Sequence, residues 1–533
     1  MSRAGFLRMS GAAALAGAAL LTSACSADAG TPDQSAGPRW DAEYDVAVVG
    51  SGCGGFTAAL TCAQQGLNTV LIEISKTTGG GSSFCGGILY NSAGNTPESY
   101  DEWTEHLGST ELGHKYVTES QTWFHWIQDS GLTVVEPRMR TGYLQGVDNF
   151  MLAMGDEEGQ YTYGCRAFFD SFEEVFAQNK GTLLLETRAE KILTDDEGKV
   201  IGLRCKDSSN KALRIAAKAV VIATGGFQGN EELRVRYLGP QADMATIHAV
   251  PYCTGNGLKM CEEVGASLAG AMSNFSATIA AAWPAKEFCT LPDDYEQRQY
   301  DDEGKYWLYS QHLDFQPANC IYVNVDGLRY EDEDAHIYRL PQATIKQKRS
   351  TGIMVMDGPT WDAWQKTPGN FGLPMTVKEQ FEKIILPQDK VGGMVYSGDT
   401  LEELADKMDA SGIATHMVNK ENLLHTVAEY NAAIEAGKGP SLEVPRYGEH
   451  KPITTPPFYA YPTRPAIYAT WGGVQINARS QVLDKNNQPI TGLYCCAPTA
   501  GGIMREIYSG SIGAAGTTGM WAGNAIVKDI TSL

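Results

Sequence analysis

Positive charge is scarce in this sequence of 533 residues, and the cysteine spacings that bind metals or haem are missing. The chain has 42 Lys and Arg against 63 Asp and Glu, a formal net charge of −21. Such a surface repels a polymer of phosphates, which argues against nucleic acid as a partner. The 12 cysteines include no CxxC or CxxCH spacing, so zinc ribbons, iron–sulfur runs and attached c-type haem have no support. After the first thirty residues, no run reaches the about 18 apolar residues that a membrane-spanning helix needs.

What remains is an ordinary globular composition with many glycines. Hydrophobic residues make up 43% and charged residues 20% of the chain, which excludes a disordered, collagenous or coiled-coil protein. The 58 glycines gather in short clusters, a placement typical of loops that approach a ligand closely.

The first residues, 1–25, have the pattern of an export signal. Arg3 and Arg8 give a positive start, and the apolar run Gly11–Leu21 is too short for a permanent membrane helix. The run leads to Cys25 through Thr-Ser-Ala, which resembles the lipobox of bacterial lipoproteins, where the cysteine carries the lipid.

Residues 26–40 are rich in Ser, Ala, Gly, Asp and Pro, a composition that predicts a tether. We therefore expect an extracytoplasmic lipoprotein, anchored through Cys25 on the outer face of a bacterial membrane. Cleavage near Ala24 without a lipid is the alternative.

A strand, a helix and a second strand follow the tether in close succession. The apolar run 45–49 predicts a strand, 56–65 has helical periodicity, and 69–73 predicts another strand. This order predicts a βαβ unit.

The turn inside this unit has the GxGxxG spacing, with Gly50, Gly52 and Gly55. Gly50 permits the tight turn, Gly52 lets backbone N–H groups approach a pyrophosphate, and Gly55 lets helix and strand pack closely. Glu73 ends the second strand and is placed to accept hydrogen bonds from a ribose. The unit therefore predicts a dinucleotide site, for which FAD and NAD are both candidates.

A second glycine cluster distinguishes the two dinucleotides. It contains Gly79, Gly80, Ser82, Gly86 and Gly87, and it begins shortly after the second strand. Such a loop can lie against a flat ring system because the missing side chains let backbone donors reach it. At this point the chain resembles the flavoprotein superfamily of soluble fumarate reductases and 3-ketosteroid dehydrogenases, in which such a segment lines the isoalloxazine. The resemblance implies FAD as the cofactor.

The resemblance continues over nearly the whole mature chain. It implies an α/β fold, a Rossmann-like FAD-binding domain of the GR2 type with an inserted α+β substrate-capping domain. The segments that carry it are Thr224–Gly226, Thr254–Gly257, Gly327–Glu333, Thr470–Gly473, Gly492–Tyr494 and Tyr508–Ser511.

The order of these segments predicts a discontinuous FAD-binding domain. Residues 41–275 plus 455–533 would form it, and residues 276–454 would form the cap. Within the cap, Thr400 and Glu403 predict the start of a helix that runs through Met408, and residues 419–436 predict another.

Two cations of the fumarate reductases are missing. The resemblance places Ala469 where they carry a His, and Tyr508 where they carry an Arg that binds the carboxylate. Each hydrogen bond to a charged group contributes roughly 1.5–3 kcal/mol, so a fumarate-like dianion is disfavoured.

Tyrosines stand at the positions that the ketosteroid dehydrogenases use. The resemblance implies that Tyr508 donates to a substrate ketone and that Tyr338 transfers the proton, although His336 is an open alternative. Arg505 is a further active-site candidate, which would hold a polar substituent or pair with Glu506.

The resemblance also assigns flavin contacts to Thr224, Gly225, Ser511 and Ile512, with Ile512 replacing a family glycine. At Pro498 the family's ribityl-binding side chain is missing.

The adjacent cysteines Cys495 and Cys496 allow a redox interpretation, but small strand residues explain them better. We expect the cysteines of this chain to be free thiols.

The sequence predicts an exported, FAD-dependent CH–CH oxidoreductase that interconverts a ketone and its conjugated enone by hydride transfer to or from flavin N5. The substrate would be steroid-like or similarly bulky and apolar, and a membrane-associated cytochrome or flavoprotein would exchange electrons with it. One alternative is a respiratory reductase of an unsaturated acid other than fumarate, such as urocanate or a cinnamate. Another is a non-catalytic lipoprotein whose flavin fold only binds a ligand or a partner chain. The direction of the reaction, the exact substrate and the oligomeric state stay open.

Overall fold

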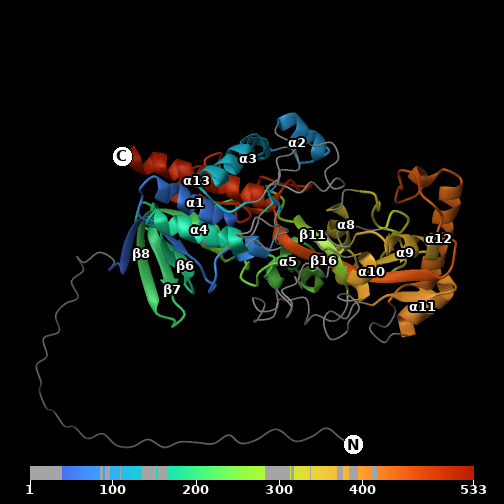
Figure 1. Cartoon of the computed structure of the whole chain (residues 1–533). Coiled ribbons are helices and arrows are strands. Elements are labelled where there is room, and N and C mark those ends of the chain that lie inside the picture. Colours follow the sequence, from blue (N-terminus) through green and yellow to red (C-terminus); the bar gives the residue numbers. More distant parts are fainter. Residues whose placement is uncertain are drawn as a thin grey trace, which may run out of the picture. The chain divides into compact units, whose positions relative to one another are not determined.

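The architecture is taken from a computed structural model (Figure 1), and all elements below lie in the unit Trp40–Leu533. Among the described residues, no helix combines the length and the apolar character needed to cross a membrane. The described residues are 39–84, 88–89, 96–108, 110–134, 152–153, 166–282, 312–313, 317–335, 338–368, 376–382, 394–410 and 417–532.

A sheet with a parallel core forms the first half of the fold. β1 pairs in parallel with β2 on one side and with β8 on the other, and its second half, Val46–Val49, is buried on both faces. Burial on both faces explains why this strand reads as a continuous apolar run. The strands are β1 (Ala42–Val49), β2 (Thr69–Ile72), β5 (Thr182–Leu184), β6 (Arg188–Thr194), β7 (Val200–Lys206), β8 (Ala212–Ile222), β18 (Gln481–Leu483) and β19 (Pro489–Cys495).

Successive residues of β1 enter two different cores. Val46 and Val48 pack with residues of α1, α3, α4 and α13, while Ala47 and Val49 pack with residues of β6, β7 and α6. Figure 1 shows α1, α4 and α13 on one side of the strands. The helices on this side of the structure are α1 (Cys53–Gln64), α2 (Pro97–Trp103), α3 (Glu111–Asp129), α4 (Arg166–Gln178), α6 (Asn256–Glu263) and α13 (Ser511–Thr531). Helix α5 (Glu231–Tyr237) packs instead with residues of the second sheet.

A second sheet is built around β16 (Phe458–Thr470), which pairs with β11, β14, β15 and β9. This central strand lies within the portion 455–533 that the sequence assigned to the FAD-binding domain. The domain boundaries themselves stay a prediction. The other strands of this sheet are β9 (Thr246–Ile247), β11 (Phe275–Ala281), β12 (His312–Leu313), β13 (Ile321–Val323), β14 (Gly352–Met356) and β15 (Tyr396–Gly398).

Helices α8 to α12 surround the second sheet, and short strand pairs complete the structure (Figure 1). These helices are α8 (Arg339–Thr344), α9 (Gly358–Trp364), α10 (Val377–Gln380), α11 (Leu401–Ala410) and α12 (Lys420–Glu435), and the short pairs are β3 (Ile88–Leu89) with β4 (Leu152–Ala153) and β10 (Leu268–Ala269) with β17 (Gly473–Val474).

The elements predicted from local patterns are present. The predicted βαβ unit is β1, α1 and β2, with α1 starting three residues earlier than expected. In α11, the N–H of Glu403 donates to Thr400 Oγ1 at 3.1 Å, as the capping pattern predicted. Asn419 caps α12, since its side chain accepts from the N–H of Asn422 at 3.0 Å. The α/β fold class is confirmed.

Candidate functional site

The turn from β1 into α1 depends on its glycines. Gly50 has φ +99°, and its N–H donates to the carbonyl oxygen of Ile72 at 2.8 Å. A Cβ atom on Gly55 would lie 1.8 Å from the carbonyl oxygen of Gly50, so a side chain there would collide with the turn. Gly52 is the N-cap residue of α1 and, as a glycine, has no side chain to cap the helix. The start of α1 therefore favours an anionic ligand such as a pyrophosphate.

Glu73 follows β2 and is buried beside this turn. One carboxylate oxygen accepts from the N–H of Ser51 at 2.9 Å and from Ser51 Oγ at 2.6 Å, and the other accepts from the N–H of Ser75 at 2.9 Å. A carboxylate has about four acceptor positions, which leaves capacity for a ribose hydroxyl. The ribose contact stays a prediction.

The second glycine cluster lies against the start of α1. Gly79 and Gly80 have φ values of +105° and +47°, a conformation that favours glycine. Ser82 Oγ accepts from the N–H of Cys53, the first residue of α1, at 3.1 Å. The loop is therefore joined directly to the helix end that favours an anion. The predicted contacts Gly86 and Gly87 lie outside the described residues.

The end of β8 lies next to the end of β1. A Cβ atom on Gly50 would lie 3.2 Å from Thr224 Cα, so the two turns are in close contact. The hydroxyl oxygen of Thr224 is buried and has no hydrogen-bond partner among the residues that the structure describes. Gly225 has φ +77°, and its carbonyl oxygen accepts from Thr499 Oγ1 at 3.0 Å. A buried hydroxyl without a partner is costly, and a bound ligand can satisfy it.

These segments fit FAD, the cofactor that the sequence predicted. We call Gly50–Gly55, Gly79–Ser82 and Thr224–Gly225 the glycine cradle. Together with the adjoining Glu73, it combines a helix start whose N-cap residue is glycine, a buried carboxylate, a hydroxyl without a partner among the described residues, and backbone that side chains would obstruct. A dinucleotide needs these features for its phosphates and its ribose.

The start of α13 lies at the same end of the sheet as the start of α1. A Cβ atom on Gly519 would lie 2.2 Å from the carbonyl oxygen of Gly54, and one on Gly523 would lie 2.7 Å from Thr61 Cβ. The later residue of α13 lies beside the later residue of α1, so the two helices run parallel to each other. Ser511 and Ile512, which the sequence assigned to flavin contacts, form the first turn of α13 after Gly510, and this helix also has no side-chain cap.

The structure brings the two predicted catalytic tyrosines together. The rings of Tyr338 and Tyr508 have centroids 4.7 Å apart at an interplanar angle of 39°, and Tyr468 lies 6.2 Å from Tyr508 at 85°. Tyr338 and Tyr508 are buried, at 4% and 8% exposure. His336 lies outside the described residues, so the alternative proton-transfer group stays open.

The tyrosines belong to a larger set of packed residues, which we call the aromatic cluster. Ala469, at the position of the missing His, is buried in β16 next to Tyr468. The cluster comprises Tyr100, Tyr116, Val117, Tyr338, Trp471, Ala497, Ile503, Met504, Tyr508, Ala514 and Trp521, with Trp103, Leu112 and Tyr468 packed against it.

Arg505 is exposed and is not a member of this cluster. Burial raises the pKa of Tyr100 above its ordinary value, and the charge of Arg505 acts against that rise. A role for Arg505 toward the substrate stays a prediction.

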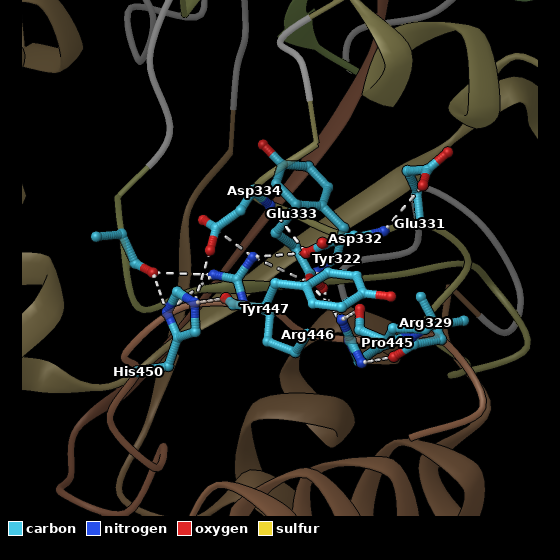
Figure 2. Close-up of polar contacts among 12 residues, drawn as sticks. Tyr322, Arg329, Glu331, Asp332, Glu333, Asp334, Pro445, Arg446, Tyr447 and His450 are labelled. Atoms are coloured by element: carbon cyan, nitrogen blue, oxygen red, sulfur yellow. Dashed lines mark hydrogen bonds and ion pairs between the residues drawn. The ribbon is translucent and has the colours of Figure 1, made fainter. Parts of the chain in front are cut away.

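A buried ion-pair network holds the segment that leads to Tyr338 (Figure 2). Arg329 Nε donates to Glu333 Oε1 at 2.9 Å, and Arg446 lies 3.4 Å from Glu333 Oε2. Burial alone would lower the pKa of Arg446, but Glu333 and Asp334 hold it above its ordinary value. The network joins residues 329–334 to the distant segment 444–450. It thereby fixes the chain five residues before Tyr338.

The adjacent cysteines are structural. Cys495 packs into the core that contains Val49, and Cys496 into the core that contains Val48, so they point to opposite faces of the sheet. Both are free thiols, as expected. Burial raises the pKa of each thiol well above its ordinary value, which opposes redox reactivity.

Sequence reasoning missed two residues of the site. Tyr468 is the third ring beside Tyr508, and its position two residues before Thr470 was the available signal. Trp103 donates from Nε1 to the carbonyl oxygen of Tyr508 at 2.8 Å. Its spacing of three from Tyr100 marks one helix face, but nothing local indicates which segment that face meets.

Known proteins resemble this chain over most of its length. A probable fumarate reductase from Shewanella frigidimarina is 25% identical over 474 residues, which are 86% of this chain and 70% of that protein. A urocanate reductase from Eggerthella lenta is 24% identical over 477 residues, which are 87% of this chain and 70% of that protein. The fold is similar to that of a 3-ketosteroid Δ1-dehydrogenase from Sterolibacterium denitrificans, with a TM-score of 0.70, 20% identity and coverage of 91% and 100% of the two chains.

The match to a family model covers the glycine cradle and every residue of the aromatic cluster except Ala514 and Trp521. Residues 45–512 match the family described as FAD binding domain. FAD is therefore the cofactor, and the sequence-based resemblance is confirmed. The chain belongs to the FAD binding domain family and is an FAD-dependent oxidoreductase of the fumarate reductase superfamily.

Proposed function

We propose that this protein interconverts a ketone and its conjugated enone, and that the substrate is uncharged, bulky and apolar. The observation that carries the proposal is the pair of buried rings, Tyr338 and Tyr508, at 4.7 Å. Positions that hold cations in the resembling fumarate reductases are Ala469 and Tyr508 in this chain. A dicarboxylate would lose charge-assisted hydrogen bonds there, whereas a ketone needs only a neutral donor.

Each tyrosine has a separate role in this proposal. Tyr508 donates a hydrogen bond to the substrate oxygen, and this bond strengthens as the oxygen becomes enolate-like. Tyr338 transfers the proton at the neighbouring carbon. A phenol donates a hydrogen bond without carrying a charge, so neither role needs a cation at the site. Bound FAD, held by the glycine cradle, supplies the two-electron transfer to or from carbon.

The test is a panel of enones and ketones, scored by the change in flavin absorbance. Tyr508→Phe should slow turnover by roughly 10²–10³-fold, as expected when one oxyanion donor is lost. FAD content should not change. Tyr447→Phe is the matched control because that side chain is 58% exposed. Equal turnover in both variants would refute the role of Tyr508.

The second candidate substrate is an unsaturated acid such as urocanate or a cinnamate. The urocanate reductase relative supports it. Comparing turnover of an enone with turnover of urocanate, with reduced viologen as the electron donor, distinguishes the two. Faster turnover of the acid would replace the ketone proposal.

The proposal includes an extracytoplasmic location, with a lipid at Cys25 and electrons exchanged with a membrane-associated cytochrome or flavoprotein. The apolar run Gly11–Leu21 and the lipobox-like residues support it. Labelled palmitate should enter the parent protein and not Cys25→Ala. Labelling of both, or of neither, would refute the anchor.

A further inference from the structure

The segment 503–510, which carries Tyr508, is held by aromatic side chains from distant helices. Three such side chains, from α2 and α3, donate hydrogen bonds to its main-chain carbonyl groups. The bonds join Tyr100 Oη to Ile503 O at 2.8 Å, Trp103 Nε1 to Tyr508 O at 2.8 Å, and Tyr116 Oη to Ser509 O at 2.8 Å and Gly510 O at 3.1 Å.

This segment has no helix or strand of its own, so no regular ladder satisfies its carbonyl groups. Buried backbone carbonyls need hydrogen-bond partners. The side chains of α2 and α3 supply them at the residue that carries the phenol and at the residues that start α13. The direction of the Tyr508 side chain therefore depends on helices that are distant in the sequence, since Trp103 and Tyr508 are 405 positions apart.

The two helices are joined to each other. His114 Nε2 lies 2.7 Å from Asp101 Oδ1, and the rings of His114 and Tyr100 meet edge to face at 5.9 Å. A Cβ atom on Gly113 would lie 2.8 Å from the Tyr100 ring, so the glycine permits this close packing. Burial raises the pKa of Tyr100 and of Tyr116, which keeps both as neutral donors. The donors therefore form one rigid support.

We infer that Trp103 is a positioning residue for Tyr508, and that Tyr100 and Tyr116 complete this support. The inference rests on the proposed role of Tyr508. The indole N–H fixes the Tyr508 backbone, which aims the phenol without touching the substrate itself.

The test replaces the indole donor and keeps an aromatic ring. Trp103→Phe should lower kcat by roughly 10-fold or more, because small misplacements of a catalytic group are costly. KM and the dissociation constant of FAD should change much less. Hydrogen exchange of the 503–510 peptide should become faster in Trp103→Phe, a readout independent of turnover.

Trp126→Phe is the matched control. Trp126 lies on α3 and is half-buried, as Trp103 is on α2. Its Nε1 donates to Gln64 Oε1 at 3.2 Å, away from the 503–510 segment. This variant should keep the kcat and the exchange rate of the parent. Tyr116→Phe removes the hydrogen bonds to Ser509 and Gly510 with a smaller change of volume. It replaces Trp103→Phe as the test variant if Trp103→Phe does not fold.

Tyr508→Phe, measured in parallel, separates the two hypotheses. If Tyr508→Phe lowers kcat while Trp103→Phe and Tyr116→Phe behave like Trp126→Phe, the positioning role is overturned and the proposed function stands. If Tyr508→Phe leaves kcat unchanged, the proposed function fails. A kcat loss and faster exchange in Trp103→Phe, with Trp126→Phe unaffected, supports the inference.

Discussion

The glycine cradle and the aromatic cluster are built by opposite means. The cradle uses backbone groups and missing side chains. Most of it comes from the βαβ unit and the loop that follows it, up to Ser82. The aromatic cluster uses side chains from α2, α3, β16, α13, the segment 503–510 and the residue before α8. A backbone site is sensitive to an added Cβ atom, whereas a side-chain site is sensitive to the contacts that hold its segments.

This difference explains where the supporting structure lies. The cradle is supported by the parallel pairing of β1 with β2 and β8. The tyrosines need two separate supports, the donors of α2 and α3 for Tyr508 and the ion-pair network for the segment before Tyr338. Perturbing either kind of support should affect one region far more than the other.

The largest expected effect on the site is the loss of FAD in Gly55→Ala. Its Cβ atom would lie 1.8 Å from the carbonyl oxygen of Gly50, so the turn must open. Overpacking costs about 1–3 kcal/mol, and the displaced turn should no longer hold FAD. The purified variant should lack the visible flavin absorbance.

Gly198→Ala is the control for this change. Gly198 has φ +82° and no heavy atom within 4 Å of an added Cβ atom. The left-handed backbone alone should cost about 1–2 kcal/mol, and FAD should remain bound. Full flavin content in Gly55→Ala would contradict a backbone-made cradle.

The next largest effect is expected from Arg446→Met. This change leaves the buried Glu333 with one fewer cation, and breaking a buried pair costs about 3–5 kcal/mol. Unfolding in urea should show this loss, while the folded variant keeps FAD and turns over more slowly because the segment before Tyr338 shifts.

Lys420→Met is the matched control. Lys420 pairs with Asp406 on the surface, and exposed pairs contribute about 0–1 kcal/mol. If the two variants lose equal stability, the network is not the support that we infer. Loss of FAD in Arg446→Met would show that the two regions are not independent.

The smallest effect concerns the pH dependence of a thiol beside the cradle. Burial raises the pKa of Cys253 to about 12 from an ordinary 9.0, and the charge of Glu73 adds to the rise. Because the folded pKa is the higher one, this contribution to stability is complete below pH 9.0 and is lost as pH rises toward about 12. Thermal unfolding measured across that range should show the decline.

At pH 8 an aromatic disulfide reagent should modify the Cys253 thiol only as the protein unfolds. Cys205 on β7 is the internal comparison, since burial raises its pKa to about 12 as well. Faster modification of Cys253 than of Cys205 would indicate that the cradle opens locally.

The sequence was sufficient for features whose cause is local. The strand 45–49, the cap Thr400 with Glu403, and the cap Asn419 each depend on residues within a few positions. The GxGxxG turn was predictable for the same reason, because each glycine is required by close packing within the βαβ unit.

The candidate site was predictable only in part. Tyr338 and Tyr508 were named through a family resemblance, but neither residue indicates that its ring meets the other at 4.7 Å. Tyr468 and Trp103 were missed because their partners lie in other segments. The predicted domain boundary between residues 454 and 455 did not indicate that β16, which follows it, is the central strand of the second sheet.

The sequence by itself determined the βαβ unit, the need for glycine in its turn, the FAD family and the replacement of expected cations by Ala469 and Tyr508. Only the tertiary structure decided that α2 and α3 hold the segment of Tyr508 and that Arg446 reaches Glu333. Hydrogen bonds and turns within a few residues follow from local geometry, whereas contacts between distant segments depend on how the buried surfaces of the whole chain pack.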